Sequence, residues 1–472
     1  MIILGTNSIK DTGYEVANSL RFDDGSGAEL TRSQGSSPSS QRLFTFSGWY
    51  KKATITPSSN QQFFSQHNDT TDRMELRFQQ GDTIDFRNNA PRCRITTNRL
   101  FRDFSAWYHV CLRVDTTQST AANRIRLYIN GVQETSFSTA DYGDQNDDLI
   151  TDASTFDVGD DSFGNAHFDG YMCEVVYCDG QSLDPTSFGE FDSDSGIWKP
   201  IDVSGLTFGT NGFYLDFEDS AALGDDVSGN NNDFTVNNLT ATDQSTDTCT
   251  NNFATLNSLE YSGGGKTFSE GNCKQFLTGV ANFTRSTIGV ASGKWYCEVK
   301  LIAGVRAMYG ISSYLSNTSS NYIGQLGNTT TGYSYGIIGN TGRLYHAGSS
   351  TASWVSTVAA DDIVMIAMDL DNYKLYFGKN GTWERSGDPT SGATGTGAYT
   401  IVAPSLNGTG FYHFAFGCNS TSEDNNSEMN LGGCSGFAVS SANQDGDGYG
   451  NFEYAVPSGY YSLCTKNLAE YG

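Results

Sequence analysis

Two segments far apart in the sequence alternate apolar and polar side chains up to an Asn-Gly pair: "NRIRLYINGVQ" (123–133) and "DNYKLYFGKNGTW" (371–383). Alternation with a period of two is typical of a half-buried strand. Asn130 and Gly131 tolerate the positive φ angles of a type I′ turn, so we expect a β-hairpin in each segment. The predicted apolar sides are Ile125, Leu127 and Ile129 in the first segment, and Tyr373, Leu375 and Phe377 in the second. Two hairpins so widely separated predict two β domains.

The composition agrees with an all-β fold. The chain has 472 residues, enough for two or three domains. It contains 53 Gly and only 8 Pro, and it shows no sustained helical periodicity. This pattern indicates strands joined by many turns rather than a disordered or collagen-like chain. We therefore predict a globular, nearly all-β protein.

The charge of the chain limits its partners. A formal net charge of -25 repels phosphate backbones and anionic membranes. No stretch of 18 apolar residues is present, and the N-terminal segment "MIILGTNSIKDTG" (1–13) is too short and too polar for a signal peptide. We expect no nucleic-acid binding, no membrane insertion and no export by the standard route.

Ten cysteines could form up to five disulfides. Cys173 and Cys178 lie five positions apart in one predicted strand, so simple alternation places them on opposite faces. Cys111 and Cys297 lie inside predicted strands, as small apolar residues do. Because no export signal is visible, we predict mostly reduced structural thiols.

The first predicted domain spans 14–199. Within "WYHVCLRVD" (107–115), Tyr108, Val110, Leu112 and Val114 form an inward row. The segment resembles the laminin-G-like, concanavalin A-like sandwich family, which implies a jelly roll of two curved antiparallel sheets. The resemblance rests, in the family's order, on "LRFDDGSGAELTR" (20–32), "FTFSGWYKKA" (44–53), "WYHVCLRVD", "RLYINGV" (126–132) and "FDGYMCEVVYCDGQSLDPTSFGE" (168–190).

A polar, turn-rich segment, 200–265, follows as a predicted connector, and 266–472 forms the second domain with a C-terminal extension. The second domain is similar to the SPRY family, another two-sheet sandwich used for binding. This similarity is carried by "GKWYCEVKL" (293–301), "YGISS" (309–313), "YSYGIIGNTGRLYHAG" (333–348), "DDIVMIAMDLDNYKLYFGKNGTW" (361–383) and "YHFAFGC" (412–418). The run 363–368 is apolar on both faces, which predicts a central strand covered on both sides.

The order of these parts, ending in "YAVPSGYYSLCTKNL" (454–468), resembles bacteriophage virion proteins of the tail-fibre or receptor-binding type. The resemblance implies a non-enzymatic adhesin on the phage particle that is assembled in the host cytoplasm. Its implied partners are a host cell-surface glycan or receptor and other virion proteins. We expect a symmetric homo-oligomer, in which repeated weak sites raise avidity.

Candidate catalytic groups are sparse. "EFDSDS" places Glu190, Asp192 and Asp194 together, but Ser195 stands where one glycosidase family has its second glutamate. Cys434 lies in "GGCSG", yet the residues after it are not helical, as a nucleophile elbow requires. Solvated acidic and glycine turns explain both motifs. A glycan-degrading tailspike and a purely structural virion protein remain alternative functions.

Calcium is the one cofactor that the sequence suggests. In "NQDGDGYGNFE" (443–453), Asn443, Asp445 and Asp447 match the first half of an EF-hand-like loop, and Glu453 could complete it. An ion-free acidic turn is the alternative. Laminin-G-like domains often bind calcium at a loop rim, and here 157–161 with Asp169 could do so.

Aromatic side chains in predicted loops are candidate glycan contacts, because sugars stack an apolar ring face on an aromatic ring. These candidates are Tyr345, His346, Trp354 and Trp383. Trp49, Trp107 and Trp295 lie within predicted strands, where core packing is the better interpretation. For Trp383 a structural role at the end of the sandwich also remains open.

Overall fold

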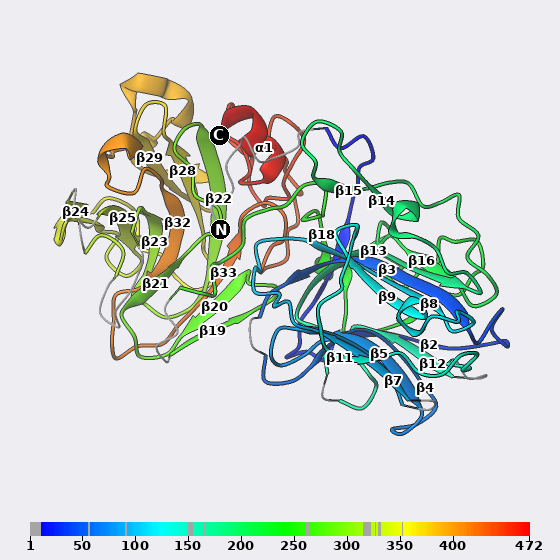
Figure 1. The fold of residues 1–472 in the computed structure, drawn as a ribbon. Helices are drawn as coiled ribbons and strands as arrows, with labels where there is room; N and C mark the ends of the chain where they lie inside the picture. Colours follow the sequence, from blue (N-terminus) through cyan, green and yellow to red (C-terminus); the bar gives the residue numbers. More distant parts are fainter. Residues whose placement is uncertain are drawn as a thin grey trace. The chain divides into compact units, whose positions relative to one another are not determined.

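The computed structural model describes residues 11–54, 57–89, 92–149, 154–164, 166–260, 265–314, 322–325, 327–328, 332–351 and 353–472. Two compact units make up this part of the chain: a first unit, Thr12–Thr250, and a second unit, Asn251–Gly472. Both consist of antiparallel sheets (Figure 1), which confirms the all-β prediction. The predicted N-terminal segment 1–13 lies mostly outside the described residues.

Helix is scarce among the described residues. Their one α-helix is α1 (Thr465–Tyr471), and the other helical pieces are short 3₁₀ turns. No helix in this part of the chain is long and apolar enough to span a lipid bilayer.

The first unit contains two eight-stranded sheets. Sheet A has the order β10-β9-β8-β3-β13-β1-β18, with β16 paired to β13. Its strands are β1 (Ser19–Phe22), β3 (Leu43–Lys52), β8 (Tyr108–Asp115), β9 (Ile125–Ile129), β10 (Val132–Gln133), β13 (Gly170–Asp179), β16 (Phe213–Leu215) and β18 (Gln244–Ser245).

Sheet B has the order β11-β7-β6-β5-β4-β12-β2-β17. Its strands are β2 (Glu29–Ser33), β4 (Gln61–His67), β5 (Arg73–Phe78), β6 (Ile84–Asn88), β7 (Cys93–Thr97), β11 (Phe137–Asp141), β12 (Thr155–Val158) and β17 (Thr235–Asn237). A separate pair, β14 (Gly189–Phe191) and β15 (Trp198–Pro200), follows β13 in the sequence.

The core of the first unit follows the predicted alternation. Val110, Leu112 and Val114 are fully buried in it, and Tyr108 packs against its edge. The predicted inward row of 107–115 is therefore confirmed. The hairpin at Asn130 and Gly131 is confirmed as well, with φ of 48° and 75° and with pairing between β9 and β10.

The predicted connector, 200–265, is divided in the structure. Its strands β16, β17 and β18 pair with β13, β2 and β1, so the first unit extends to Thr250 rather than ending at Lys199. A buried ion pair between Lys51 Nζ and Asp247 Oδ2 (2.6 Å) ties the end of this segment to β3. The three strands have only two or three residues each, too few to show alternation in the sequence.

The second unit also has two sheets. The first has the order β19-β20-β33-β22-β28-β29-β30, with β31 paired to β29. Its strands are β19 (Lys266–Ser269), β20 (Lys274–Leu277), β22 (Lys294–Ala303), β28 (Ile363–Asp369), β29 (Lys374–Lys379), β30 (Thr382–Trp383), β31 (Tyr399–Thr400) and β33 (Asn425–Asn430).

The second sheet has the order β21-β32-β23-β25-β26-β27, with β24 paired to β25. Its strands are β21 (Asn282–Arg285), β23 (Ala307–Ser312), β24 (Gly327–Asn328), β25 (Gly332–Ile338), β26 (Leu344–His346), β27 (Ser349–Thr351) and β32 (His413–Cys418).

Strand β28 is buried on both faces, as predicted from its apolar run. Val364, Ile366 and Met368 belong to the main core of the second unit. Met365 and Ala367 face a second cluster, to which the C-terminal segment contributes Phe452 and Tyr460. The C-terminal extension is thus a layer of the second unit.

Candidate functional site

A group of aromatic side chains on β25, β26 and two neighbouring segments forms the candidate binding surface. We call Tyr333, Tyr335, His346, Trp354 and Tyr399 the aromatic platform. The His346 ring stacks on Tyr335, with centroids 4.2 Å apart, and on Tyr333 at 5.7 Å. Tyr399 contacts Tyr335 at 5.6 Å and meets Trp354 edge to face at 5.2 Å. Tyr335 is buried beneath His346 and Tyr399, and the other four rings of the platform are partly exposed.

A cation lies beside the platform. The guanidinium of Arg385 lies over the Trp354 ring, 4.2 Å from its centroid. Arg385 is exposed and belongs to the 3₁₀ turn Glu384–Ser386. The Glu384 carboxylate accepts a hydrogen bond from the Ser356 backbone N–H (3.1 Å) and another from its hydroxyl, which connects this turn to the loop that carries Trp354.

Backbone conformation around the platform is unusual. Ala347, Ser353, Arg385 and Ser386 all have φ between 51° and 60°. Ala347 follows His346, Ser353 precedes Trp354, and Ser386 follows Arg385, which carries the platform cation. A non-glycine residue in the left-handed region costs about 1 kcal/mol, and such strain concentrates at functional sites.

The platform is largely uncharged near neutral pH. Burial lowers the pKa of His346 below its ordinary value, and its Nδ1 lies 3.1 Å from the Ser334 carbonyl oxygen. Burial raises the pKa of Tyr335 to about 12, and its hydroxyl accepts a hydrogen bond from the Val402 N–H. Neutral rings with an adjacent guanidinium provide stacking surfaces together with donors for hydroxyl or carboxylate oxygens.

The structure brings together two of the four aromatic residues selected from the sequence. His346 and Trp354 belong to the platform. Tyr345 follows Leu344 on β26 and points to the opposite face from His346, where it contacts Tyr322. Trp383 packs on Tyr296 in the cluster that covers β28.

Sequence reasoning missed Tyr333, Tyr335, Tyr399 and Arg385. The spacing of Tyr333 and Tyr335 places both on one face of a strand and was an available signal. Tyr399 and Arg385 lie in turn-rich segments, and no local pattern connects them to β25.

The predicted calcium turn, 443–453, is a hydrogen-bonded hairpin. Asp445 Oδ1 accepts the N–H groups of Asp447 and Tyr449, both at 3.0 Å. Asp445 Oδ2 accepts bonds from Ser462 N (2.9 Å), Ser462 Oγ (2.7 Å) and Asn467 Nδ2 (2.9 Å). One oxygen of this carboxylate therefore closes the turn, and the other anchors the C-terminal segment.

The remaining proposed calcium ligands of this turn also bond to the protein. Asn443 Nδ2 donates to the Glu453 carbonyl oxygen at 3.0 Å. The Glu453 carboxylate accepts bonds from Ser440 N (2.6 Å) and Ser440 Oγ (2.7 Å), and these bonds lower its pKa. The structure does not gather the ligand atoms of Asn443, Asp445, Asp447 and Glu453 around one point.

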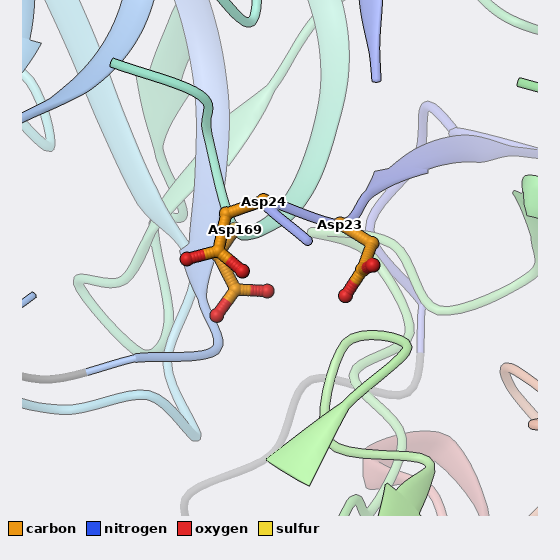
Figure 2. A group of neighbouring side chains, drawn as sticks. All are labelled: Asp23, Asp24 and Asp169. Atoms are coloured by element: carbon orange, nitrogen blue, oxygen red, sulfur yellow. The ribbon is translucent and has the colours of Figure 1, made fainter. Parts of the chain in front are cut away.

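Three carboxylates that do converge lie in the first unit. Ligand oxygens of Asp23, Asp24 and Asp169 lie within 4.8 Å of one another (Figure 2). Asp169 is buried and accepts a hydrogen bond from the Thr54 hydroxyl, whereas Asp24 is exposed. Partial desolvation of the carboxylate by the surrounding protein, followed by the neighbouring Asp23 charge, raises the pKa of Asp24.

This aspartate trio could hold a cation, because hard carboxylate oxygens suit Ca²⁺ and a cation would relieve repulsion between like charges. Of the residues weighed in the sequence for a calcium rim, only Asp169 belongs to the trio. Asp157 accepts a hydrogen bond from Ser65 Oγ (3.3 Å), and Asp160 lies 3.2 Å from His167 Nδ1.

The two catalytic motifs weighed in the sequence are turns. Asp192 accepts bonds from Ser195 N (2.8 Å) and Ser195 Oγ (2.7 Å), and both Glu190 and Asp192 pair with Lys199. Cys434 is buried, and no helix follows it before α1. Glu190 and Asp192 thus share one lysine, and Cys434 lacks the following helix of a nucleophile elbow.

Comparison with protein families identifies the fold of the first unit. Residues 23–181 match the Laminin_G_3 family, described as the concanavalin A-like lectin/glucanases superfamily. The chain therefore contains a concanavalin A-like domain, in agreement with the resemblance noted in the sequence. No curated protein matches the chain.

Solved structures similar to this chain include two SPRY domains. The SPRY domain of human HERC1 is 12% identical, covers 37% of this chain and 96% of its own, and has a TM-score of 0.26. The TRIM65 PSpry domain is 13% identical, covers 38% and 91%, and has a TM-score of 0.28. Domain 4 of AbnA, a GH43 extracellular arabinanase from Geobacillus stearothermophilus in complex with arabinotriose, is 21% identical, covers 31% and 64%, and has a TM-score of 0.24.

Proposed function

We propose that this protein is a non-enzymatic adhesin on the surface of a bacteriophage particle that binds a glycan of the host cell through the aromatic platform. The main observation behind this proposal is the cluster of partly exposed rings around His346, together with the Arg385 guanidinium that lies over Trp354. The concanavalin A-like domain, a fold of lectins and glucanases, supports sugar recognition as a class.

A sugar ring would stack its apolar face on Tyr333, Tyr399 or the exposed part of Trp354. Arg385, whose guanidinium is exposed beside the rings, would donate hydrogen bonds to hydroxyl or carboxylate oxygens of the ligand. Because His346 is neutral near pH 7, the platform itself adds no cationic charge. Several copies in an oligomeric fibre would convert a weak single site into firm attachment.

The polar face of sheet B supports a binding role over hydrolysis. Its acidic residues Glu75 and Asp85 are fully buried and share ion pairs with Arg77 at 3.2 Å. Glu75 also pairs with Arg87, and Asp85 with Arg94 at 2.8 Å. Carboxylates held in this way already accept hydrogen bonds from arginines, which leaves fewer oxygen lone pairs for contact with a substrate.

One observation favours the alternative, a glycan-degrading tailspike. Burial, followed by the neighbouring Asp160 carboxyl, raises the pKa of Glu29 on β2 to about 7. A protonated carboxyl beside a second carboxyl is the arrangement from which glycosidases build a general acid. Glu29 is therefore the residue to substitute if hydrolysis is observed.

The test uses the purified full-length protein with host cells and host surface polysaccharide. An adhesin adsorbs to the cells, competes with phage adsorption and releases no reducing ends from the polysaccharide. If the wild-type protein releases reducing ends from the polysaccharide and Glu29→Gln does not, the protein is a glycan hydrolase instead. Failure both to adsorb and to compete would leave a purely structural virion protein.

A further inference from the structure

Two cysteines from distant parts of the first unit lie beside each other. The sulfur atoms of Cys173 and Cys249 are 3.7 Å apart, although the residues are separated by 76 positions in the sequence. Cys173 lies on β13 opposite Trp49 of β3. Cys249 follows β18, in the segment that closes the first unit at Thr250.

A β-bulge sets the direction of Cys173. The pairing of β13 with β3 shifts between Cys173 and Val176, and Glu174 in the bulge has a φ of 52°. Because of the extra residue, Met172, Val175 and Tyr177 all face the core, while Cys178 belongs to the cluster on the other face. The expectation that Cys173 and Cys178 point to opposite faces is therefore wrong: the bulge places both away from the core.

Exposure distinguishes this pair from the other thiols. All ten cysteines lie in the described part of the chain, and Cys249 is the one that is not buried. Cys173 is fully buried beneath it. An oxidant that reaches the half-buried Cys249 thus meets a thiol with a second thiol in contact with it.

We propose that Cys173 and Cys249 form a site of oxidative cross-linking that takes a low-molecular-weight disulfide as its co-reactant. The Cys249 thiolate attacks one sulfur of the co-reactant, forms a mixed disulfide and releases one thiolate. The Cys173 thiolate then attacks Cys249 Sγ and releases the second. The two protons lost from the protein thiols are taken up by the two released thiolates, so one disulfide is reduced as one is formed.

The bond would lock the last segment of the first unit to the middle of sheet A. That segment already holds Lys51 through Asp247, and Val16 N–H donates to Thr250 Oγ1 at 3.2 Å. A covalent link across 76 positions restricts the unfolded chain strongly. In a reducing cytoplasm the pair stays as thiols, and in an oxidising medium it closes.

The surroundings of the two thiols determine the rate at which they are oxidised. Burial of the sulfur, then Cys173 and the nearby Glu174 carboxylate, raise the pKa of Cys249 well above its ordinary value. Only a small fraction of the thiol is ionised at neutral pH, so oxidation is slow and accelerates as the pH rises.

The test is thiol mapping of the full-length protein. Protein purified with reductant is transferred to excess oxidised glutathione at alkaline pH, alkylated, and analysed by non-reducing peptide mass spectrometry. We expect a single cross-link between the peptides that carry Cys173 and Cys249, with the other eight of the ten thiols alkylated. Ten alkylated thiols, glutathione retained on Cys249, or a link between other cysteines would each overturn the proposal.

Two variants and a thermal measurement complete the test. Cys249→Ser should show no cross-link, whereas Cys178→Ala, a change on the same strand as Cys173, should keep it. Oxidation should raise the Tm of the first unit by roughly 5 to 10 °C in the wild type and leave Cys249→Ser unchanged. An equal rise in Cys249→Ser would overturn the assignment, and the wild-type peptide map decides alone if that variant does not fold.

Discussion

The guanidinium of Arg385 lies 4.2 Å from the centroid of the Trp354 ring, and the two residues come from different loops of the second unit. Arg385 itself, and Ser353 immediately before Trp354, adopt positive φ. The two loops thus contain residues in a strained backbone conformation where they place the Arg385 guanidinium on the Trp354 ring. This relationship is the basis of the binding predictions.

Replacement of Trp354 by alanine removes an aromatic surface and the support of Arg385. We expect Trp354→Ala to weaken glycan binding at least about tenfold, because aromatic side chains at the centre of a binding surface supply a large share of the affinity. Cell adsorption and titration with host glycan measure the effect. Trp354 is partly exposed and packs against the main core of the second unit, so the Tm should fall by an amount similar to that in Trp383→Ala.

Trp383→Ala is the matched control. Trp383 packs on Tyr296 outside the platform, so its loss should lower the stability of the second unit by about 2 kcal/mol and leave glycan affinity unchanged. A loss of affinity in Trp383→Ala, with normal binding by Trp354→Ala, would contradict the location of the site.

The first unit requires the segment that the sequence presents as a connector. A fragment of residues 12–250 should fold alone, whereas 12–199 should not, because the shorter fragment lacks three strands and Asp247. Asp247→Ala in the full chain should cost about 3 to 5 kcal/mol, since it leaves the buried Lys51 unpaired. Circular dichroism and chemical denaturation check both expectations. Cooperative unfolding of 12–199 would show that the segment is dispensable.

Glu174 should make the first unit less stable as the pH rises. Burial raises its pKa from an ordinary 4.5 to about 7, and its carboxyl accepts hydrogen bonds from Tyr214 (2.8 Å) and Tyr14 (3.2 Å). Between pH 4.5 and pH 7 the folded state binds a proton that the unfolded state releases. The stabilisation is therefore complete below pH 4.5 and is lost as the pH rises through 7, by up to about 1 kcal/mol per pH unit.

Glu174→Gln keeps a side-chain oxygen that can accept hydrogen bonds from both tyrosines, but the glutamine side chain cannot ionise. Its Tm should fall less between pH 5 and pH 8 than that of the wild type, as measured by differential scanning calorimetry. The exposed Glu190→Gln should retain the wild-type profile. Identical pH profiles for Glu174→Gln and the wild type would refute the role of this carboxyl.

Calcium should stabilise the first unit through Asp23, Asp24 and Asp169. Millimolar Ca²⁺ is expected to raise its Tm by a few degrees, and a chelator should reverse the change. Asp24→Asn should abolish the response, because Asp24 is exposed and its replacement spares the fold. Asp447→Asn is the control in the other predicted turn; loss of the response there, and not in Asp24→Asn, would assign the ion to 443–453.

The sequence alone determined the longer strands and the two Asn-Gly hairpins. Alternation at Ile125, Leu127 and Ile129, and the Asn130-Gly131 pair, act between neighbouring residues, so the pattern predicts burial and turn type without knowledge of the rest of the chain. The continuous apolar run of β28 likewise predicted its burial on both faces. These features are local consequences of side-chain period and backbone sterics.

Only the tertiary structure decided which side chains meet. Tyr335 and His346 come from the paired strands β25 and β26, whereas Tyr399 lies on β31 of the other sheet, and the packing of the two sheets brings its ring to Tyr335. Cys173 and Cys249 meet because a bulge turns β13 and because the closing segment returns to the first unit. Such contacts depend on register, bulges and very short strands, whose energies arise from the whole packed unit rather than from any local pattern.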